Sequence, residues 1–198
     1  MSPLPDGFPQ HHKPSNVSEI IDRGTHSFVR ENPDCVLKWP RQNEDALKSL
    51  ECEKRALAIV GQHAYIVQFL GTLETGLCFE YHPLLSMRHY YAKSGLPSLG
   101  QRYRWCRQAV SGFSYIHSKN LIHHDISARN ILLSSDLTIK ICDFGSATQL
   151  GEEVHGSAEF RYSFGRVSSQ WKATFAYDLF CMGALFYEII AGSLPLKL

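Results

Sequence analysis

Two short polar patterns in the middle of the chain constrain its fold more than any other part of the sequence. Residues 123–130 read His-His-Asp-Ile-Ser-Ala-Arg-Asn, and residues 143–145 read Asp-Phe-Gly. Between them lie two apolar segments, 131–133 and 138–142, which we expect to form short strands joined by a turn. Single aspartate and asparagine residues often mark only turns. Two such patterns in this order, separated by a hairpin, instead indicate a polar site.

The residue types in these patterns suit one kind of chemistry. Phosphoryl transfer from ATP needs a carboxylate that orients the attacking hydroxyl, ligands that hold Mg²⁺ on the phosphates, and cations near the developing charge. Asp125, Asn130 and Asp143 could supply the first two. The patterns resemble the catalytic loop and the magnesium loop of the protein kinase superfamily. The resemblance implies that Asp125 is the catalytic base and that Asn130 and Asp143 bind the metal.

Residues before the two patterns agree with the resemblance in their order along the chain. Lys38 ends an apolar stretch and matches the lysine that holds the α- and β-phosphates. Glu53, on a predicted helix over 43–60, matches the ion-pair partner of that lysine, and Glu51 is the alternative if the register is two residues off. Arg129 could add a cation near the γ-phosphate. Outside this context, Lys38 and Glu53 would be an exposed pair of little consequence.

The resemblance also implies a nucleotide cleft behind residues 79–83, which resemble the hinge between two lobes. Phe79 would be the gatekeeper, and the backbone of Glu80 and His82 would meet the adenine edge. Each apolar residue expected around the adenine could instead be an ordinary core residue. The expected ATP-binding set is Ile21, Gly24, Val29, Val36, Lys38, Phe79, Glu80, His82 and Leu132.

The chain departs from the family pattern in three places. Only Gly24 survives of the glycine-rich loop, and Asp22 adds a negative charge there, which predicts weak ATP binding. His124 replaces an arginine that commonly receives an activation-loop phosphate, so we predict activity that does not depend on phosphorylation of that loop. Residues 162–164 stand where the family has Ala-Pro-Glu.

An acid in an apolar stretch supports the same interpretation. Asp178 interrupts the apolar run 175–191, which we expect to be a helix buried on all sides. A buried acid needs a partner, and Asp178 matches the family aspartate that holds the catalytic-loop backbone. His123 would give further structural support to that loop. The chain ends soon afterwards, at Leu198, so we expect an incomplete C-terminal lobe with apolar surface for a possible partner protein.

The expected fold class is α+β, a two-lobed kinase-like fold. After a flexible tail over 1–16, the domain would span 17–198, with a small β-rich lobe over about 17–80 and a mainly helical lobe over about 83–198. We expect extended segments within 19–39 on both sides of Gly24, a strand pair over 65–73 and 76–81, a helix over 99–118 and a long loop over 146–174. On the helix over 99–118, the expected apolar face is Tyr103, Cys106, Val110, Phe113 and His117.

Composition excludes several other functions. Hydrophobic residues make up 44% of the chain and the formal net charge is +1, so a packed core is expected and a nucleic-acid partner is not. The six cysteines form no Cys-x-x-Cys pair, which favours a reducing intracellular location, cytoplasmic or nuclear. Asp178 and Glu188 interrupt the longest apolar run, so no membrane span is expected.

The signals for the phosphorylated hydroxyl are mixed. Residues 127–129, Ser-Ala-Arg, resemble the loop of tyrosine kinases, whereas Ser157 occupies the place of a threonine found in serine/threonine kinases. The sequence therefore predicts a protein kinase that uses ATP and Mg²⁺ on a protein substrate, with serine or threonine favoured. The alternatives are a pseudokinase acting as a nucleotide-binding or scaffold module, a tyrosine-directed kinase, and a small-molecule phosphotransferase of similar fold.

Overall fold

The computed structural model describes residues 20–23, 27–32, 35–41, 43–73, 76–154 and 172–194. The expected tail over 1–16, Gly24, Ser157 and residues 162–164 lie outside the described residues. The side chains of β1 and β2 are also outside them.

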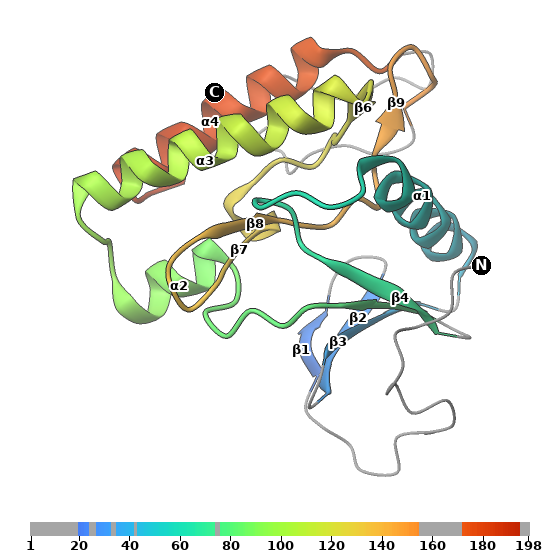
Figure 1. Ribbon diagram of the computed structural model, residues 1–198, viewed down its shortest axis with the longest axis horizontal. Coiled ribbons are helices and arrows are strands. Elements are labelled where there is room, and N and C mark those ends of the chain that lie inside the picture. The colour runs from blue at the N-terminus through green and yellow to red at the C-terminus, as the bar shows by residue number, and fades with distance from the viewer. Residues whose placement is uncertain are drawn as a thin grey trace.

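The N-terminal lobe is one antiparallel sheet with one helix (Figure 1). Its five strands follow the order β1-β2-β3-β5-β4. They are β1 (Ile20–Arg23), β2 (Ser27–Asn32), β3 (Cys35–Pro40), β4 (Phe69–Leu73) and β5 (Gly76–Phe79). The expectation of extended segments around Gly24 is correct, although the chain forms three strands there and not two.

The helix of this lobe, α1 (Glu44–Val60), has clear start and stop signals. The side chain of Asn43 accepts a hydrogen bond from the backbone N–H of Ala46 at 2.9 Å, which satisfies one of the free donors of the first turn. The helix ends at Gly61, whose φ of 65° is a left-handed conformation that glycine adopts without strain. The predicted helix over 43–60 is thus confirmed.

The C-terminal lobe is mainly helical. Figure 1 shows α3 and α4 side by side, with the β7–β8 hairpin near them. The helices are α2 (Met87–Ser94), α3 (Leu99–Ser118) and α4 (Phe175–Ala191), and a 3₁₀ turn, η1, covers Ala128–Asn130. The strand pairs are β6 (Leu121–Ile122) with β9 (Thr148–Gln149), and β7 (Ile131–Leu133) with β8 (Ile139–Ile141). The two-lobed α+β class is therefore confirmed.

The exposed faces of α3 and α4 correct two expectations. Tyr103 and Val110, expected in the buried face of α3, are 56% and 45% exposed. Phe113 of the expected face is buried as predicted. The other large side chains that α3 buries are Trp105 and Ile116, which lie on a neighbouring stripe. Helix α4 is not buried on all sides, since Leu179 is 59% exposed. Among the described residues, it packs through the face that carries Asp178.

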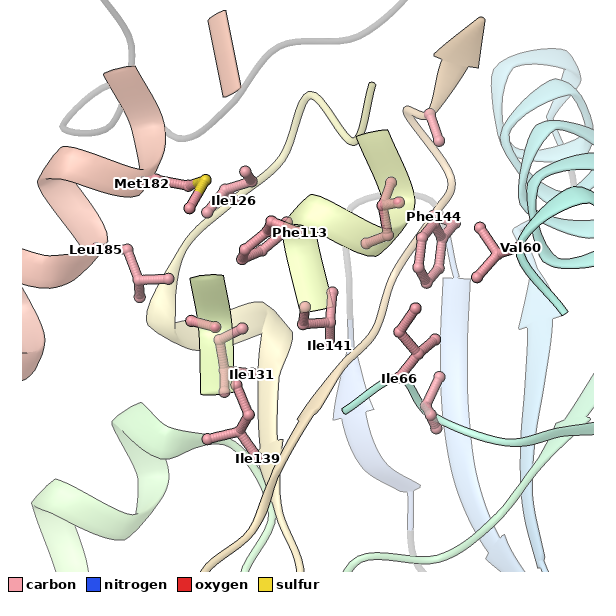
Figure 2. Close-up of a cluster of buried hydrophobic side chains, with 14 of the residues drawn as sticks. Val60, Ile66, Phe113, Ile126, Ile131, Ile139, Ile141, Phe144, Met182 and Leu185 are labelled. Atoms are coloured by element: carbon pink, nitrogen blue, oxygen red, sulfur yellow. The ribbon is translucent and has the colours of Figure 1, made fainter. Parts of the chain in front are cut away.

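One hydrophobic core connects the two lobes. Members labelled in Figure 2 include Val60, Ile66, Phe144, Ile141, Phe113, Met182 and Leu185. Phe144 is fully buried, so it anchors the segment that follows β8 against α1 on one side and α3 on the other. Burying a phenylalanine side chain stabilises a fold by about 1.5–3 kcal/mol. The residue before it, Asp143, is thereby held between the lobes.

Among the helices of the described residues, none combines the length and the apolar character that crossing a bilayer requires.

Candidate active site

A cavity of about 320 Å³ opens between the two lobes. The sheet contributes Val36, Lys38 and Phe79, and the other lobe contributes Leu132 and Asp143. The remaining predicted site residues that line it are Glu53, Glu80, His82, Arg129 and Asn130. Ile21 and Val29 lie in β1 and β2, and only their backbone is described. The structure therefore gathers most of the expected set around one cavity.

Lys38 joins the two lobes through two carboxylates. Its Nζ lies 2.6 Å from Glu53 Oε2 and 2.8 Å from Asp143 Oδ1. Glu53 is buried and Glu51 is exposed, so the structure selects the first of the two expected partners. Burial by itself would lower the pKa of Lys38, but the attraction of Asp143 and Glu53 raises it. Lys38 is therefore a permanent cation at the inner wall of the cavity.

The pKa values of the two acids beside Lys38 shift in opposite directions. Burial raises the pKa of Glu53, an effect that the charge of Lys38 only partly offsets. Burial also opposes ionisation of Asp143, yet Lys38 lowers the pKa of that carboxyl to about 2. Asp143 thus remains an anion at neutral pH. It also has a φ of 65°, so the backbone turns sharply where the carboxylate enters the cavity.

Asp125 is held by its own loop. Arg129 Nη2 lies 3.2 Å from Asp125 Oδ2, and Asn130 Nδ2 donates to the same oxygen at 2.8 Å. The 3₁₀ turn η1 brings these side chains back over Asp125. Burial and then the charge of Asp143 raise the pKa of Asp125, while Arg129 opposes that rise. A carboxylate that is fixed in place and more basic than usual suits proton acceptance.

The amide of Asn130 is oriented in a way that suits metal binding. Both of its hydrogen bonds, to the carbonyl and the carboxylate of Asp125, use Nδ2. Its oxygen is thus the end of the side chain that is left for a ligand, as is a carboxylate oxygen of Asp143. The described residues hold no cluster of three His, Cys, Asp or Glu side chains that could bind a metal alone. Magnesium commonly takes one or two carboxylates together with water and phosphate oxygens, so this donor set fits it.

Asp178 holds the backbone of the loop that carries Asp125. Its Oδ2 accepts the backbone N–H of His123 at 2.8 Å, and its Oδ1 accepts that of His124 at 3.0 Å. His117 of α3 adds a contact from Nε2 at 2.9 Å. Burial would raise the pKa of this fully buried carboxyl, but these donors lower it. The sequence predicted the backbone contacts, whereas His117 was expected only as part of an apolar helix face.

His123 connects the two polar patterns. Its Nε2 lies 3.1 Å from the carbonyl oxygen of Cys142, and its ring centroid lies 4.9 Å from that of Phe144. Its Nδ1 lies 3.3 Å from the backbone nitrogen of Asp125. The ring therefore fixes the distance between the loop that carries Asp125 and the loop that carries Asp143.

His124 has a different environment from its neighbour. It is 1% exposed, and neither ring nitrogen has a hydrogen-bond partner among the described residues. Its ring lies 5.3 Å from that of Tyr177. Burial lowers the pKa of His124 to about 4, so the ring is neutral at pH 7.

The segment after β5 has one backbone group that is ready for a ligand. Glu80 N–H donates to the carbonyl of Gln68 at 3.0 Å, and the Glu80 carboxylate contacts Lys140 and His82 at 3.3 and 3.2 Å. The backbone N–H of His82 has no hydrogen-bond partner within the described part of the chain. His82 is one of the residues that line the cavity.

Known proteins are similar to this chain in sequence. A family model described as the protein kinase domain matches residues 35–198. The serine/threonine-protein kinase A-Raf of Homo sapiens is 37% identical over 202 residues, covering 92% of this chain and 33% of that protein. The serine/threonine-protein kinase STY46 of Arabidopsis thaliana is 30% identical over 168 residues, covering 81% of this chain and 29% of that protein. The chain thus spans about a third or less of these relatives, and it belongs to the protein kinase family.

Proposed function

We propose that this chain is an ATP-dependent protein kinase that transfers the γ-phosphate of ATP to a serine or threonine hydroxyl. The observation that carries the proposal is the meeting of Lys38, Glu53 and Asp143 within 2.8 Å at the wall of a cavity between the lobes. Removing three charged groups from water costs free energy. Their meeting at one cavity therefore favours a functional site over a structural contact.

Each residue has a defined part in the proposed reaction. Lys38, held by Glu53, binds phosphate oxygens, while Asp143 and Asn130 would hold Mg²⁺. The metal, when bound, neutralises phosphate charge. Asp125 orients the attacking hydroxyl and accepts its proton, and Arg129 keeps the Asp125 carboxylate in position at 3.2 Å.

The adenine would lie against the segment after β5. The N–H of His82, which has no partner among the described residues, and the carbonyl of Glu80 would offer one donor and one acceptor to the edge of the base. Val36 and Leu132 line the cavity from the two lobes and would enclose the ring between apolar surfaces. A largely apolar pocket with a few placed polar groups is typical of cofactor sites.

The preference for serine or threonine rests on the relatives, since both A-Raf and STY46 are named as serine/threonine-protein kinases. Residues 127–129, Ser-Ala-Arg, instead resemble the loop of tyrosine kinases. Phosphorylation of a peptide that carries only tyrosine would correct this part of the proposal.

We also propose an intracellular location, cytoplasmic or nuclear. All six cysteines are free thiols, and Cys35, Cys78 and Cys181 are buried. Free thiols persist in compartments that keep cysteine reduced.

Removing the charge of Asp143 tests the proposed site. The Asp143→Asn variant should attract Mg²⁺ less strongly and lose the ion pair with Lys38, whose Nζ lies at 2.8 Å. We expect phosphotransfer to fall by about 10²-fold or more. The measurements are ATP binding by calorimetry with and without Mg²⁺, and transfer of radiolabelled phosphate to a protein substrate.

A matched control is Asp136→Asn, because Asp136 lies in the exposed turn between β7 and β8 and asparagine favours the same turn. It should behave like the wild type. ATP binding without any transfer by the wild type would contradict the kinase proposal and indicate a pseudokinase. Equal transfer by wild type and Asp143→Asn would contradict the site.

The environment of His124 leads to a prediction about regulation. A neutral ring that is buried against Tyr177 offers no charge to a phosphate group. We therefore expect kcat to stay within about twofold when the purified protein is treated with a phosphatase. The check is a comparison of treated and untreated protein, with phosphate content followed by mass spectrometry. A large loss of activity on dephosphorylation would contradict it.

A further inference from the structure

Glu152 lies where three separated parts of the chain meet. Its carboxylate Oε2 contacts Arg55 Nη2 of α1 at 3.2 Å and accepts the backbone N–H of Gln149 at 3.1 Å. Its backbone carbonyl accepts the N–H of Ala173 at 2.8 Å, and Gly151 N–H donates to the carbonyl of Ala173 at 2.9 Å. One residue therefore connects α1, the stretch after β9 and the stretch before α4.

Helix α1 contacts the start of the same segment through another face. Glu53 Oε1 accepts the backbone N–H of Phe144 at 3.3 Å, and Ser49 Oγ donates to the carbonyl of Gly145 at 3.2 Å. The approach at Gly145 is so close that a Cβ there would collide with the Ser49 hydroxyl. Ser49 and Glu53 are four residues apart and share a helix face. Arg55, two residues after Glu53, points to a different side of α1 and needs its own anchor.

The side chains of Arg55 and Glu152 are 50% and 40% exposed. An isolated ion pair with this exposure contributes little to stability. Part of that weakness is the cost of ordering two long side chains. Here the Gln149 N–H already orients the Glu152 carboxylate, and the backbone of Ala173 bonds to the carbonyl of Glu152 and to the N–H of Gly151. The fold thus presents a fixed negative charge to Arg55, which makes the contact more favourable than its exposure suggests.

We propose that Glu152 is a positioning residue that acts through Arg55 to keep α1 where Glu53 reaches Lys38. The carboxylate is part of the chain itself, so this positioning needs neither a ligand nor a covalent modification. This role rests on the proposed kinase function only where enzyme activity is measured. Its structural readout, the protection of α1 amides, is independent of catalysis.

Reversing the two charges separates this role from a general effect on folding. We expect Arg55→Glu and Glu152→Arg each to lower kcat by about fivefold, because fewer molecules keep α1 in place. The double variant restores an ion pair of opposite polarity and should recover kcat to within about twofold of the wild type. Glu152→Gln keeps the shape of the side chain without its charge, so its kcat should lie between that of Glu152→Arg and that of the wild type. KM for ATP should not change, since neither residue lines the cavity.

The matched control is Lys48→Glu. Lys48 pairs with Glu44 on the exposed surface of the same helix, and both side chains are at least 66% exposed. This reversal should leave kcat unchanged, as expected for a well-exposed pair.

Hydrogen exchange of residues 49–57 is the second measurement, made without nucleotide. Faster exchange in each single variant and recovery in the double variant would support the proposal. Wild-type exchange in both single variants, or a double variant no better than either, would overturn it. A wild type that transfers no phosphate would contradict the kinase proposal instead, and the exchange data would still decide the role of Glu152.

Discussion

Substituting asparagine for Asp125 is expected to lower kcat by about 10²- to 10⁴-fold, the usual contribution of a positioned general base. Asparagine is isosteric and can still accept the hydrogen bond that Asn130 Nδ2 donates at 2.8 Å. The loop should therefore keep its shape while losing its proton acceptor. Asp125 is not among the residues that line the cavity, so ATP affinity should remain close to that of the wild type.

The pH profile gives the same prediction a second readout. A base works only when deprotonated, and burial and the charge of Asp143 raise the pKa of Asp125 above its usual value of 3.8. In the wild type, kcat should fall as the pH decreases through this raised pKa, and in the variant this acidic limb should disappear. The control is Asp45→Asn, an exposed position in the first turn of α1. An Asp125→Asn variant with wild-type kcat would refute the assignment.

The polar site was more predictable than its surroundings because its members constrain one another. Lys38 and Asp178 are charged residues in apolar stretches, and such groups need partners when the chain folds. Glu53 lies among other charged residues, and its pairing with Lys38 was expected from the family resemblance. The structure provides those partners, at 2.6 Å for Lys38 and Glu53 and at 2.8 Å for Asp178 and the His123 N–H. The resemblance of their order along the sequence to the protein kinase pattern indicated which groups would meet.

Short elements and helix faces were less predictable. The helix α2 has only eight residues, and its start depends on the Ser86 side chain accepting the His89 N–H, a signal that many turns share. Strand β6 has two residues and exists only through pairing with β9, which lies far along the chain. The face that α3 buries was misassigned because apolar residues occupy two adjacent stripes, and only packing around Trp105 decides between them.

Partners that are themselves ordinary residues left no sequence signal. His117 and Arg55 sit on helices among other polar residues, yet they contact Asp178 at 2.9 Å and Glu152 at 3.2 Å. Contacts of this kind depend on how helices are placed in space. Periodicity describes one helix at a time, so it cannot supply them.

Replacing Asp178 by alanine is expected to cost about 3–5 kcal/mol of the free energy of unfolding. The fully buried carboxylate accepts the backbone N–H groups of His123 and His124 and contacts His117. Alanine would leave these buried donors without an acceptor, and each such donor costs about 1–3 kcal/mol. Because a domain is usually stable by only about 5–15 kcal/mol, Tm should fall by on the order of 10 °C.

A second substitution at the same position and the pH dependence of stability distinguish this effect from a simple loss of side-chain volume. Asp178→Asn keeps one oxygen acceptor at the same place and should lose about half as much stability. The donors hold the pKa of Asp178 below 3.8, so in the wild type its contribution is present above that pH and is lost as the pH falls through the lowered pKa. Chemical denaturation of both variants, with the exposed Asp45→Ala as control, measures the difference. Equal unfolding free energies for Asp178→Ala and Asp45→Ala would show that Asp178 does not hold the catalytic loop.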